Sequence, residues 1–197
     1  MTYLLGLTGS IGMGKSTTAK MFAEAGCAVW DADAAVHRLY APGGAAVAPM
    51  AEAFPDAIVD GGVSRDALKR IIAEDPTALR RIEVIVHPLV GADRQAFIAG
   101  VDSDIVVLDI PLLFEGRNAD AFDAVVVVTA PENIQRERVL ARGTMTEAQF
   151  EAIKAKQMPD AEKRARADFI VQTDTLENAR DQVAAIVAGI RKGLADA

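Results

Sequence analysis

The residues with the most distinctive chemistry lie near the N-terminus, in the run Gly9-Ser10-Ile11-Gly12-Met13-Gly14-Lys15-Ser16. This run fits the pattern G-x-x-x-x-G-K-[S/T] of a phosphate-binding loop without a mismatch. Glycines let the backbone curl so that successive N–H groups point at phosphate oxygens, and the N-terminus of a following helix adds partial positive charge. In such a loop Lys15 reaches the β- and γ-phosphates and the Ser16 hydroxyl ligates Mg²⁺. The run predicts a nucleoside triphosphate site; a glycine-rich turn that matches by chance is the less favoured alternative.

Two acidic residues follow the apolar segment Cys27–Trp30, in the sequence Asp31-Ala32-Asp33. Because the carboxyl ends of parallel strands face the ligand crevice of an open α/β sheet, we expect both carboxylates near the phosphate loop. A kinase needs a carboxylate that orients the acceptor hydroxyl and accepts its proton, and we assign this role to Asp33. Asp31 would assist through the substrate or a Mg²⁺-bound water. The alternative for either residue is N-capping of a helix over Asp33–Tyr40.

A third acidic residue, Asp109, ends the apolar segment Ile105–Leu108. An acidic residue at the end of such a strand can hold Mg²⁺, here through water. The residues that follow, Ile110-Pro111-Leu112-Leu113-Phe114-Glu115, are expected to form a loop at the same edge of the sheet. We expect the last four to contact the acceptor, with the Glu115 carboxylate accepting hydrogen bonds. For Leu113 alone, ordinary hydrophobic packing is the better interpretation.

Three arginines, Arg136, Arg138 and Arg142, lie on one predicted helix, and the last two share a face because they are four residues apart. Cations on a segment that closes over a nucleotide neutralise charge on the transferred phosphoryl group. Arg142 is the stronger candidate because it precedes Gly143, a predicted hinge. For Arg136 a solvated helix face is an equally good interpretation.

One histidine, His87, precedes Pro88 inside a helical pattern. The proline is expected to end or kink the helix, and His87 either hydrogen-bonds the substrate or caps locally. The other histidine, His37, is predicted to be a surface residue.

Five short apolar segments rich in β-branched residues alternate with helical stretches. Near-continuous Val, Ile and Leu runs predict strands buried on both faces, and therefore a parallel sheet. We expect an α/β three-layer sandwich with a five-stranded parallel sheet and helices on either side. The predicted strands are Tyr3–Leu7, Cys27–Trp30, Ile105–Asp109, Ala124–Thr129 and Asp168–Val171.

Two longer segments interrupt this pattern. Residues 31–100 exceed one crossover helix, have helical patterning, and are expected to form a pocket for the phosphate acceptor. Residues 133–166 are rich in Arg and Lys and are interrupted by Gly143 and Pro159, as a hinged lid would be. Residues 1–30, 101–132 and 167–197 would then form the core of a single domain. A final helix is predicted over about 176–193.

The composition is that of an ordinary folded protein, with 51% hydrophobic and 25% charged residues among 197. A net charge of −7 argues against a general nucleic-acid binder, because no global positive field collects phosphates. The single cysteine, Cys27, excludes an intramolecular disulfide and is expected to be a buried packing thiol. No apolar stretch approaches the length of a membrane span and no secretory signal is evident. We expect a cytoplasmic protein with no membrane partner, as a monomer, with an oligomer as the alternative.

Together these segments resemble the dephospho-coenzyme A kinase family. The phosphate loop alone indicates only a nucleotide-binding superfamily, whereas the D-A-D and P-L-L-F-E elements, each after its own strand, make the resemblance specific. The matching residues are 6–16, Asp31-Ala32-Asp33 with Arg38, His87-Pro88, 109–115, and Gln157-Met158-Pro159 through Arg164 to Ala167-Asp168-Phe169-Ile170. One departure follows Ile170, where the family usually has a V/I-D-N-x-G-like stretch near the adenine and this chain has Val171-Gln172-Thr173-Asp174.

The resemblance implies a P-loop nucleoside triphosphate hydrolase fold and transfer of the γ-phosphate of ATP, with Mg²⁺, to the ribose 3′-hydroxyl of dephospho-CoA. This reaction is the last step of coenzyme A biosynthesis. In the family the first insertion holds the CoA moiety and the second is the ATP lid. The implied catalytic residues are Asp33, Lys15 and Arg142. The implied ATP contacts are Ile11, Gly12, Met13, Gly14, Lys15, Ser16, Thr17, Arg138 and Arg142, with Ser16 and, through water, Asp109 for Mg²⁺. The implied dephospho-CoA contacts are Asp31, Asp33, Arg38, His87, Leu112, Leu113, Phe114 and Glu115.

Two other functions remain as alternatives. A nucleoside monophosphate or small-metabolite kinase with the same core predicts acceptor-site arginines that grip a monophosphate, and the first insertion is poor in well-placed ones. A nucleotide-dependent regulatory switch is the non-enzymatic alternative. A GTPase would carry an N-K-x-D motif, which does not occur after the later strands.

Overall fold

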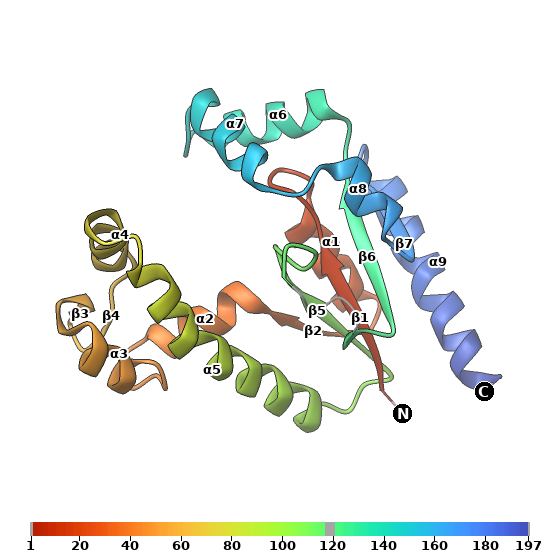
Figure 1. Cartoon of the computed structure of the whole chain (residues 1–197). Helices are drawn as coiled ribbons and strands as arrows, with labels where there is room; N and C mark the ends of the chain where they lie inside the picture. The colour runs from red at the N-terminus through yellow and green to blue at the C-terminus, as the bar shows by residue number, and fades with distance from the viewer. Residues whose placement is uncertain (1, 117–120, 197) are drawn as a thin grey trace. The chain divides into compact units, whose positions relative to one another are not determined.

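The computed structural model of the chain describes residues 2–116 and 121–196. The chain divides into two compact units (Figure 1). The first, here called the sheet unit, comprises Met1–Trp30 and Asp102–Ala197. The second, the helical unit, is the contiguous segment Asp31–Val101. Each unit has a hydrophobic core of its own.

The sheet unit is built on five strands in the order β2-β5-β1-β6-β7. Strand β1 runs parallel to β5 and β6, and β7 runs parallel to β6. Every residue of β5 and β6 is buried, which accounts for their unbroken apolar sequences. The strands are β1 (Tyr3–Thr8), β2 (Ala28–Asp31), β5 (Ile105–Asp109), β6 (Ala124–Thr129) and β7 (Phe169–Gln172). The predicted α/β fold with a five-stranded parallel sheet is confirmed.

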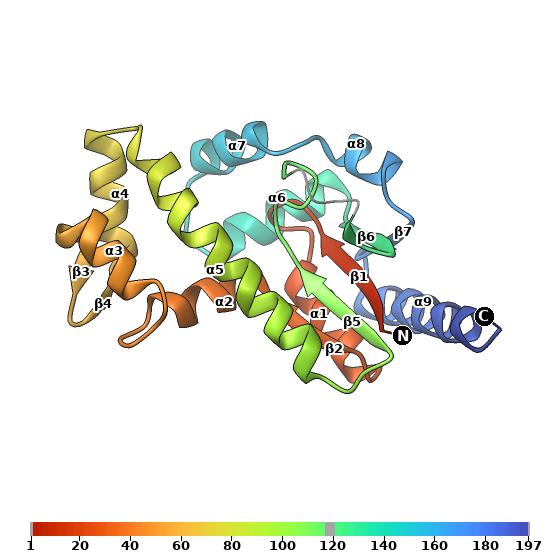
Figure 2. The ribbon, with the colours of Figure 1, turned by 60° about the horizontal axis from the view of Figure 1, so that its bottom comes forward.

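Two helices cover one face of this sheet, α1 (Lys15–Glu24) and α9 (Leu176–Ala195) (Figure 1, Figure 2). Phe22 of α1 and Val183 of α9 pack in one core with Leu5 and Val126 of the strands. The strand residues of this core alternate along the chain, because successive side chains of a strand point to opposite faces. This core fixes the strand and the helix that flank the phosphate loop.

The other face of the sheet is covered near β6 by the segment after β5 and by the last part of residues 133–166, the predicted lid. Leu113 and Phe114 pack there against Val125 and Val127, and Met158 lies against the same cluster. The helices of the predicted lid are α6 (Glu132–Ala141), α7 (Glu147–Lys156) and α8 (Asp160–Ala165). Gly143 separates α6 from α7 with a φ of 64°, a conformation that favours glycine, and Pro159 is the N-cap residue of α8.

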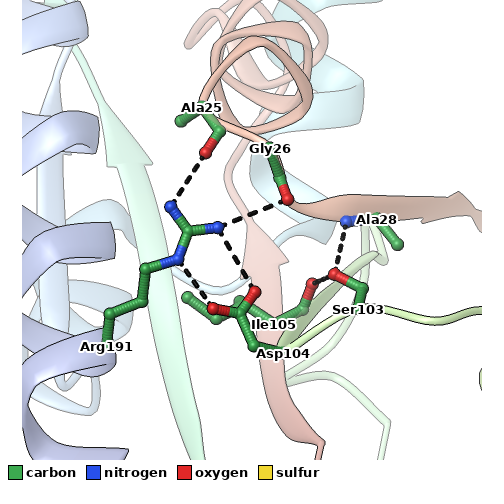
Figure 3. A network of polar contacts seen from close by, with 7 residues as sticks. All are labelled: Ala25, Gly26, Ala28, Ser103, Asp104, Ile105 and Arg191. Atoms are coloured by element: carbon green, nitrogen blue, oxygen red, sulfur yellow. Dashed lines mark hydrogen bonds and ion pairs between the residues drawn. The ribbon is translucent and has the colours of Figure 1, made fainter. Parts of the chain in front are cut away.

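Helix α9 is tied to the edge of the sheet at which β2 and β5 begin. Figure 3 shows the Arg191 guanidinium between the Asp104 carboxylate and the carbonyl groups of Ala25 and Gly26. The Arg191 Nε to Asp104 Oδ2 distance is 2.7 Å. One arginine therefore joins the last helix to two chain turns that lie far from it in the sequence.

Cys27 is buried directly after the turn at Gly26. Burial raises the pKa of the Cys27 thiol to about 11, and the nearby Arg191 only partly opposes this effect. The side chain packs in the core with Phe22 and Ile105. The prediction of a buried packing thiol is confirmed.

The helical unit contains four α-helices, one 3₁₀ turn and a short hairpin among its described residues. Its core is formed by apolar residues that include Leu39, Met50, Phe54 and Ile82. The elements are α2 (Ala32–Tyr40), α3 (Val47–Ala53), η1 (Pro55–Ala57), β3 (Ile58–Val59), β4 (Gly62–Val63), α4 (Arg65–Glu74) and α5 (Ala78–Gly100). Among the residues that the structure describes, in either unit, no helix has the length and apolarity needed to cross a membrane.

The structure adds detail to the helical patterning predicted for residues 31–100. Between α3 and α4 the strands β3 and β4 pair antiparallel across a turn at Asp60 (φ 51°) and Gly61 (φ 79°). An Asp-Gly pair between apolar residues is a hairpin signal, and no hairpin was predicted there. Pro88 was expected to end or kink its helix, and α5 does not end there. Apolar residues on both sides of the proline, from Ile82 to Val90, pack in the core, and this packing sustains the helix.

Candidate phosphate-transfer site

The phosphate loop connects β1, which ends at Thr8, to α1, which begins at Lys15. Gly12 and Gly14 have φ values of 78° and 92°, which L side chains rarely adopt. At Gly12 a Cβ would also lie 2.5 Å from Val139 Cγ2, so glycine is required there on two counts. Within the described residues no side chain caps α1 at Gly14. The first N–H groups of α1 are therefore suited to bind an anion.

Side chains from three later segments support the loop backbone. Gln135 Nε2 donates to the Ile11 carbonyl oxygen at 2.7 Å, and the Ile11 N–H donates to Gln157 Oε1 at 3.1 Å. The Thr173 hydroxyl donates to the Met13 carbonyl oxygen at 2.7 Å. No role was predicted for any of these three residues. No local pattern identifies their partners, because 124 to 160 positions separate the bonded residues.

Lys15 and Asp109 form an ion pair between the first residue of α1 and the last residue of β5. The Asp109 side chain is only 2% exposed, whereas that of Lys15 is 16% exposed. The structure thus brings together the two charged donor-site residues that were predicted from separate motifs. The Ser16 hydroxyl lies in the same first turn of α1, and Ser16 and Thr17 are both exposed. This set of residues fits a triphosphate with its metal ion.

A metal ion would depend on the nucleotide for most of its ligands. Over residues 2–116 and 121–196, no group of three or more His, Cys, Asp or Glu side chains is placed to hold a metal ion. Ser16 and Asp109 alone leave most of an octahedral Mg²⁺ shell to phosphate oxygens and water, which is the usual arrangement in nucleotide sites.

The loop after β5 differs from the expected acceptor surface. Leu113 and Phe114 are buried in the core of the sheet unit, so the packing interpretation of Leu113 is the one that the structure shows. Leu112 is exposed. Glu115 Oε1 accepts the Met158 N–H at 2.9 Å and lies 3.0 Å from Lys163 Nζ. The carboxylate predicted to bind substrate thus has partners within the protein.

The Glu115–Lys163 contact is an ion pair, because Nζ lies within range but not in a hydrogen-bonding direction. The Lys163 side chain is fully buried and that of Glu115 is 20% exposed. Burial acts to raise the pKa of the Glu115 carboxyl, but the Met158 N–H and the Lys163 ammonium outweigh it, and the pKa lies below its ordinary value. No role was predicted for Lys163.

The lid arginines have different surroundings. Arg138 donates from Nη1 to the Thr173 hydroxyl at 2.9 Å and from Nη2 to the Thr173 carbonyl oxygen at 2.5 Å. Arg136 forms an ion pair with Glu147 of α7, as a helix-face residue would. Arg142 is exposed and caps the C-terminus of α6, next to the turn at Gly143. Arg138 therefore supports the end of β7, while Arg142 lies at the predicted hinge.

A pocket adjoins the loop on the side of the lid. It has a volume of about 410 Å³ and is lined in part by Met13 of the loop and by Gln135, Lys154 and Arg164 of the lid. The Met13 sulfur accepts the Ala130 N–H at 3.1 Å. The loop and the predicted lid thus line an open pocket within the sheet unit.

The other expected acceptor residues belong to the helical unit. Asp31 is the N-cap of α2, and its carboxylate accepts the Ala34 N–H at 2.9 Å, so the capping alternative describes its observed contact. Asp33 lies exposed in the first turn of the same helix. Arg38 forms an ion pair with Asp93 at 2.7 Å, and His87 is exposed on α5. His37 is also exposed, as predicted.

Comparisons with known proteins identify the family. The family model for dephospho-CoA kinase matches residues 3–178. A dephospho-CoA kinase from Ruegeria pomeroyi is 66% identical over 193 residues, which cover 98% of both chains. One from Cereibacter sphaeroides is 64% identical over 190 residues, which cover 96% of both.

Solved structures agree with this relationship. A crystal structure from Thermus thermophilus is 31% identical, has a TM-score of 0.85, and is matched over 95% of this chain and 97% of its own. The dephospho-CoA kinase from Campylobacter jejuni, at 22% identity and a TM-score of 0.71 over 98% and 99% of the two chains, shares the fold. The loop, the Lys15–Asp109 pair and the match along nearly all of the sequence lead to one conclusion: the chain belongs to the dephospho-CoA kinase family.

Proposed function

We propose that this protein transfers the γ-phosphate of ATP to the ribose 3′-hydroxyl of dephospho-CoA, giving CoA and ADP in the last step of coenzyme A biosynthesis. Membership of a kinase family implies a nucleotide phosphoryl donor. The observation that carries the proposal is the Lys15–Asp109 pair beside an uncapped helix N-terminus, because this arrangement suits a bound triphosphate.

On the donor side, the N–H groups of the loop and of the first turn of α1 would hold the phosphates. The proposed ATP-binding residues are Ile11, Gly12, Met13, Gly14, Lys15, Ser16, Thr17, Arg138 and Arg142. Mg²⁺ bound with the nucleotide would neutralise phosphate charge, with Ser16 as a direct ligand and Asp109 as a ligand through water. Lys15 would exchange part of its contact with Asp109 for phosphate oxygens, and Arg142 would add positive charge from the lid.

On the acceptor side, Asp33 would orient the 3′-hydroxyl and accept its proton. The exposed position of Asp33 in the first turn of α2 leaves its carboxylate accessible to a substrate. Asp31, Arg38, His87 and residues 112–115 are the other proposed acceptor contacts. The corresponding division is a core of residues 1–30, 101–132 and 167–197, an acceptor-binding insertion over 31–100 and a lid over 133–166. We propose a cytoplasmic monomer.

The experiment that tests this function is a substrate panel. The purified protein is incubated with ATP and Mg²⁺ and with dephospho-CoA, AMP, CMP or shikimate, and product formation is followed by mass spectrometry. We expect phosphorylation of dephospho-CoA at the 3′ position and little turnover of the other acceptors. Preference for AMP or CMP would overturn the proposal. Replacing ATP by GTP and omitting Mg²⁺ test the donor and the metal separately.

The alternatives weighed above are not favoured. The relatives matched over almost the whole chain are named dephospho-CoA kinases, not nucleoside monophosphate kinases or regulatory switches. A shikimate kinase from Acinetobacter baumannii has a TM-score of 0.55 at 17% identity, which shows a shared fold alone.

A further inference from the structure

Both backbone groups of one phosphate-loop residue, Ile11, are held by glutamine side chains. Gln135 donates to the Ile11 carbonyl oxygen at 2.7 Å, and Gln157 Oε1 accepts the Ile11 N–H at 3.1 Å. The two glutamines come from different parts of the lid, Gln135 from α6 and Gln157 from the residue that ends α7. The loop is therefore contacted from two places in the predicted lid. Gln135 lies near the point where the lid leaves the core, and Gln157 lies near the point where the lid rejoins it.

The return segment of the lid is fixed to the core immediately after Gln157. The next residue, Met158, donates its N–H to Glu115 Oε1 at 2.9 Å, and the buried Lys163 pairs with the same carboxylate at 3.0 Å. The Lys163 N–H donates to the Pro159 carbonyl oxygen at 3.1 Å. Gln157 thus extends toward the loop from a firmly anchored position.

The loop needs such support because its own backbone is permissive. Ile11 precedes Gly12, whose φ of 78° lies in a region that glycine enters and leaves at little cost. Within the loop itself a turn forms in which the Met13 N–H donates to the Ser10 carbonyl oxygen at 3.2 Å. A side chain that binds the Ile11 amide restricts the loop to fewer conformations before a ligand arrives.

We propose that Gln157 is a positioning residue for the phosphate loop, which holds the Ile11 amide so that the following N–H groups are arranged for a triphosphate. Gln157 then couples the shape of the loop to the segment where the lid rejoins the core. This inference rests on the proposed function for its kinetic consequence. Its structural consequence, protection of the Ile11 amide, holds whatever the substrate is.

Gln157 is a better site for a test than Gln135. Gln135 is 2% exposed, so its replacement also alters buried packing. Gln157 is half-buried and ends a helix, where a side chain of similar size is accommodated. Gln157→Leu removes the acceptor, and Gln157→Glu keeps an acceptor oxygen at the same place. Lys156→Ala, at the neighbouring exposed position, is the matched control.

The first measurement is hydrogen–deuterium exchange of the Ile11 amide in the nucleotide-free protein. Loss of one hydrogen bond raises the exchange rate by about three- to tenfold, which we expect for Gln157→Leu. Gln157→Glu and Lys156→Ala should exchange as the wild type does. An unchanged rate in Gln157→Leu, with the thermal unfolding temperature also unchanged, would overturn the inference.

The second measurement separates binding from turnover. For Gln157→Leu we expect KM for ATP to rise about fivefold, while KM for dephospho-CoA stays within twofold and kcat falls less than KM rises. A rise confined to KM for dephospho-CoA would contradict a role at the phosphate loop. If the wild type fails to phosphorylate dephospho-CoA, the proposed function fails, and the exchange experiment still decides the role of Gln157.

Discussion

The donor residues and the expected acceptor residues are held in different ways. Around the phosphate loop, side chains from distant parts of the sequence bind the backbone, as Gln135, Gln157 and Thr173 do. Lys15 pairs with a carboxylate that is almost fully buried. In the helical unit, Asp33 and His87 are exposed on helices, and Arg38 makes a surface ion pair.

This difference corresponds to what phosphate binding and proton transfer each require of the residues involved. A phosphate group is recognised by backbone N–H groups and fixed charges, so a donor site has to be shaped before the ligand binds. A general base has to approach only one hydroxyl, and an exposed carboxylate on a helix can do so once the acceptor binds. Variants of the donor residues should therefore weaken ATP binding as well as turnover, whereas variants of the general base should lower turnover alone.

The largest effect is expected from Lys15→Ala. Removing the charge from the phosphate loop should lower kcat/KM about 10³-fold and weaken ATP binding as well. Because Asp109 would lose a partner, the thermal unfolding temperature must be measured alongside, and Lys15→Ala/Asp109→Asn serves as the variant without the buried charge. Activity within tenfold of the wild type would show that the loop does not bind phosphate through Lys15.

A smaller and more selective effect is expected from Asp33→Asn. Loss of the general base should lower kcat about 10²-fold while the Kd for ATP, measured by calorimetry, stays the same. The matched control is Asp66→Asn, because Asp66 is also an exposed acidic residue in the first turn of a helix of the same unit and belongs to no proposed site. Near-normal turnover in Asp33→Asn, or an equal loss in both variants, would refute the assignment.

Two of the three arginines of α6 and its C-cap, Arg138 and Arg142, offer a comparison within one helix. Arg142→Ala should lower kcat/KM about tenfold without changing stability, because Arg142 is exposed at the end of α6. Arg138→Ala should lower the free energy of unfolding by about 1–2 kcal/mol, because Thr173 would lose a charged donor. Denaturant unfolding and steady-state kinetics on both variants test this contrast. Equal loss of stability in the two would contradict it.

The smallest effect concerns acid stability. The folded-state pKa of Glu115 is lowered, so its contribution to stability is complete above the ordinary pKa of about 4.3 and is lost as the pH falls through the lowered value. Glu115→Gln should therefore flatten the dependence of the unfolding free energy on pH below about pH 4. The same pH slope in the variant and the wild type would contradict a native carboxylate paired with Lys163.

The sequence predicted the parts of the fold that depend on local patterns. The predicted strand Ala124–Thr129 coincides with β6, and β1 extends only one residue beyond the predicted Tyr3–Leu7. The phosphate loop could be recognised from the sequence because its glycines, its lysine and its serine all fall within the short run 9–16. Predicting the contact between Gln157 and Ile11 would require the tertiary fold, since 146 positions separate them.

Two features were misjudged because they depend on tertiary contacts that the sequence does not reveal. Packing of α5 in the core of the helical unit overrides the helix-breaking tendency of Pro88. The sequence did not identify Lys163 as the buried partner of Glu115, because Lys163 lies 48 positions later, near the end of residues 133–166, whose path the sequence does not define. Glu115 was therefore expected to contact a substrate.

The division of the chain into two units also has a consequence for its synthesis. The helical unit is one contiguous stretch, Asp31–Val101, so all of its core residues have been translated before β5 is made. Strand β1 can pair with its neighbours only much later, because β5 and β6 are translated about a hundred residues after it. Helix α9, which covers β1, is translated later still. Domains generally fold as units while the ribosome is still translating. The inserted segment can therefore fold on the nascent chain while the phosphate loop, which is translated before it, still lacks the side chains that hold it.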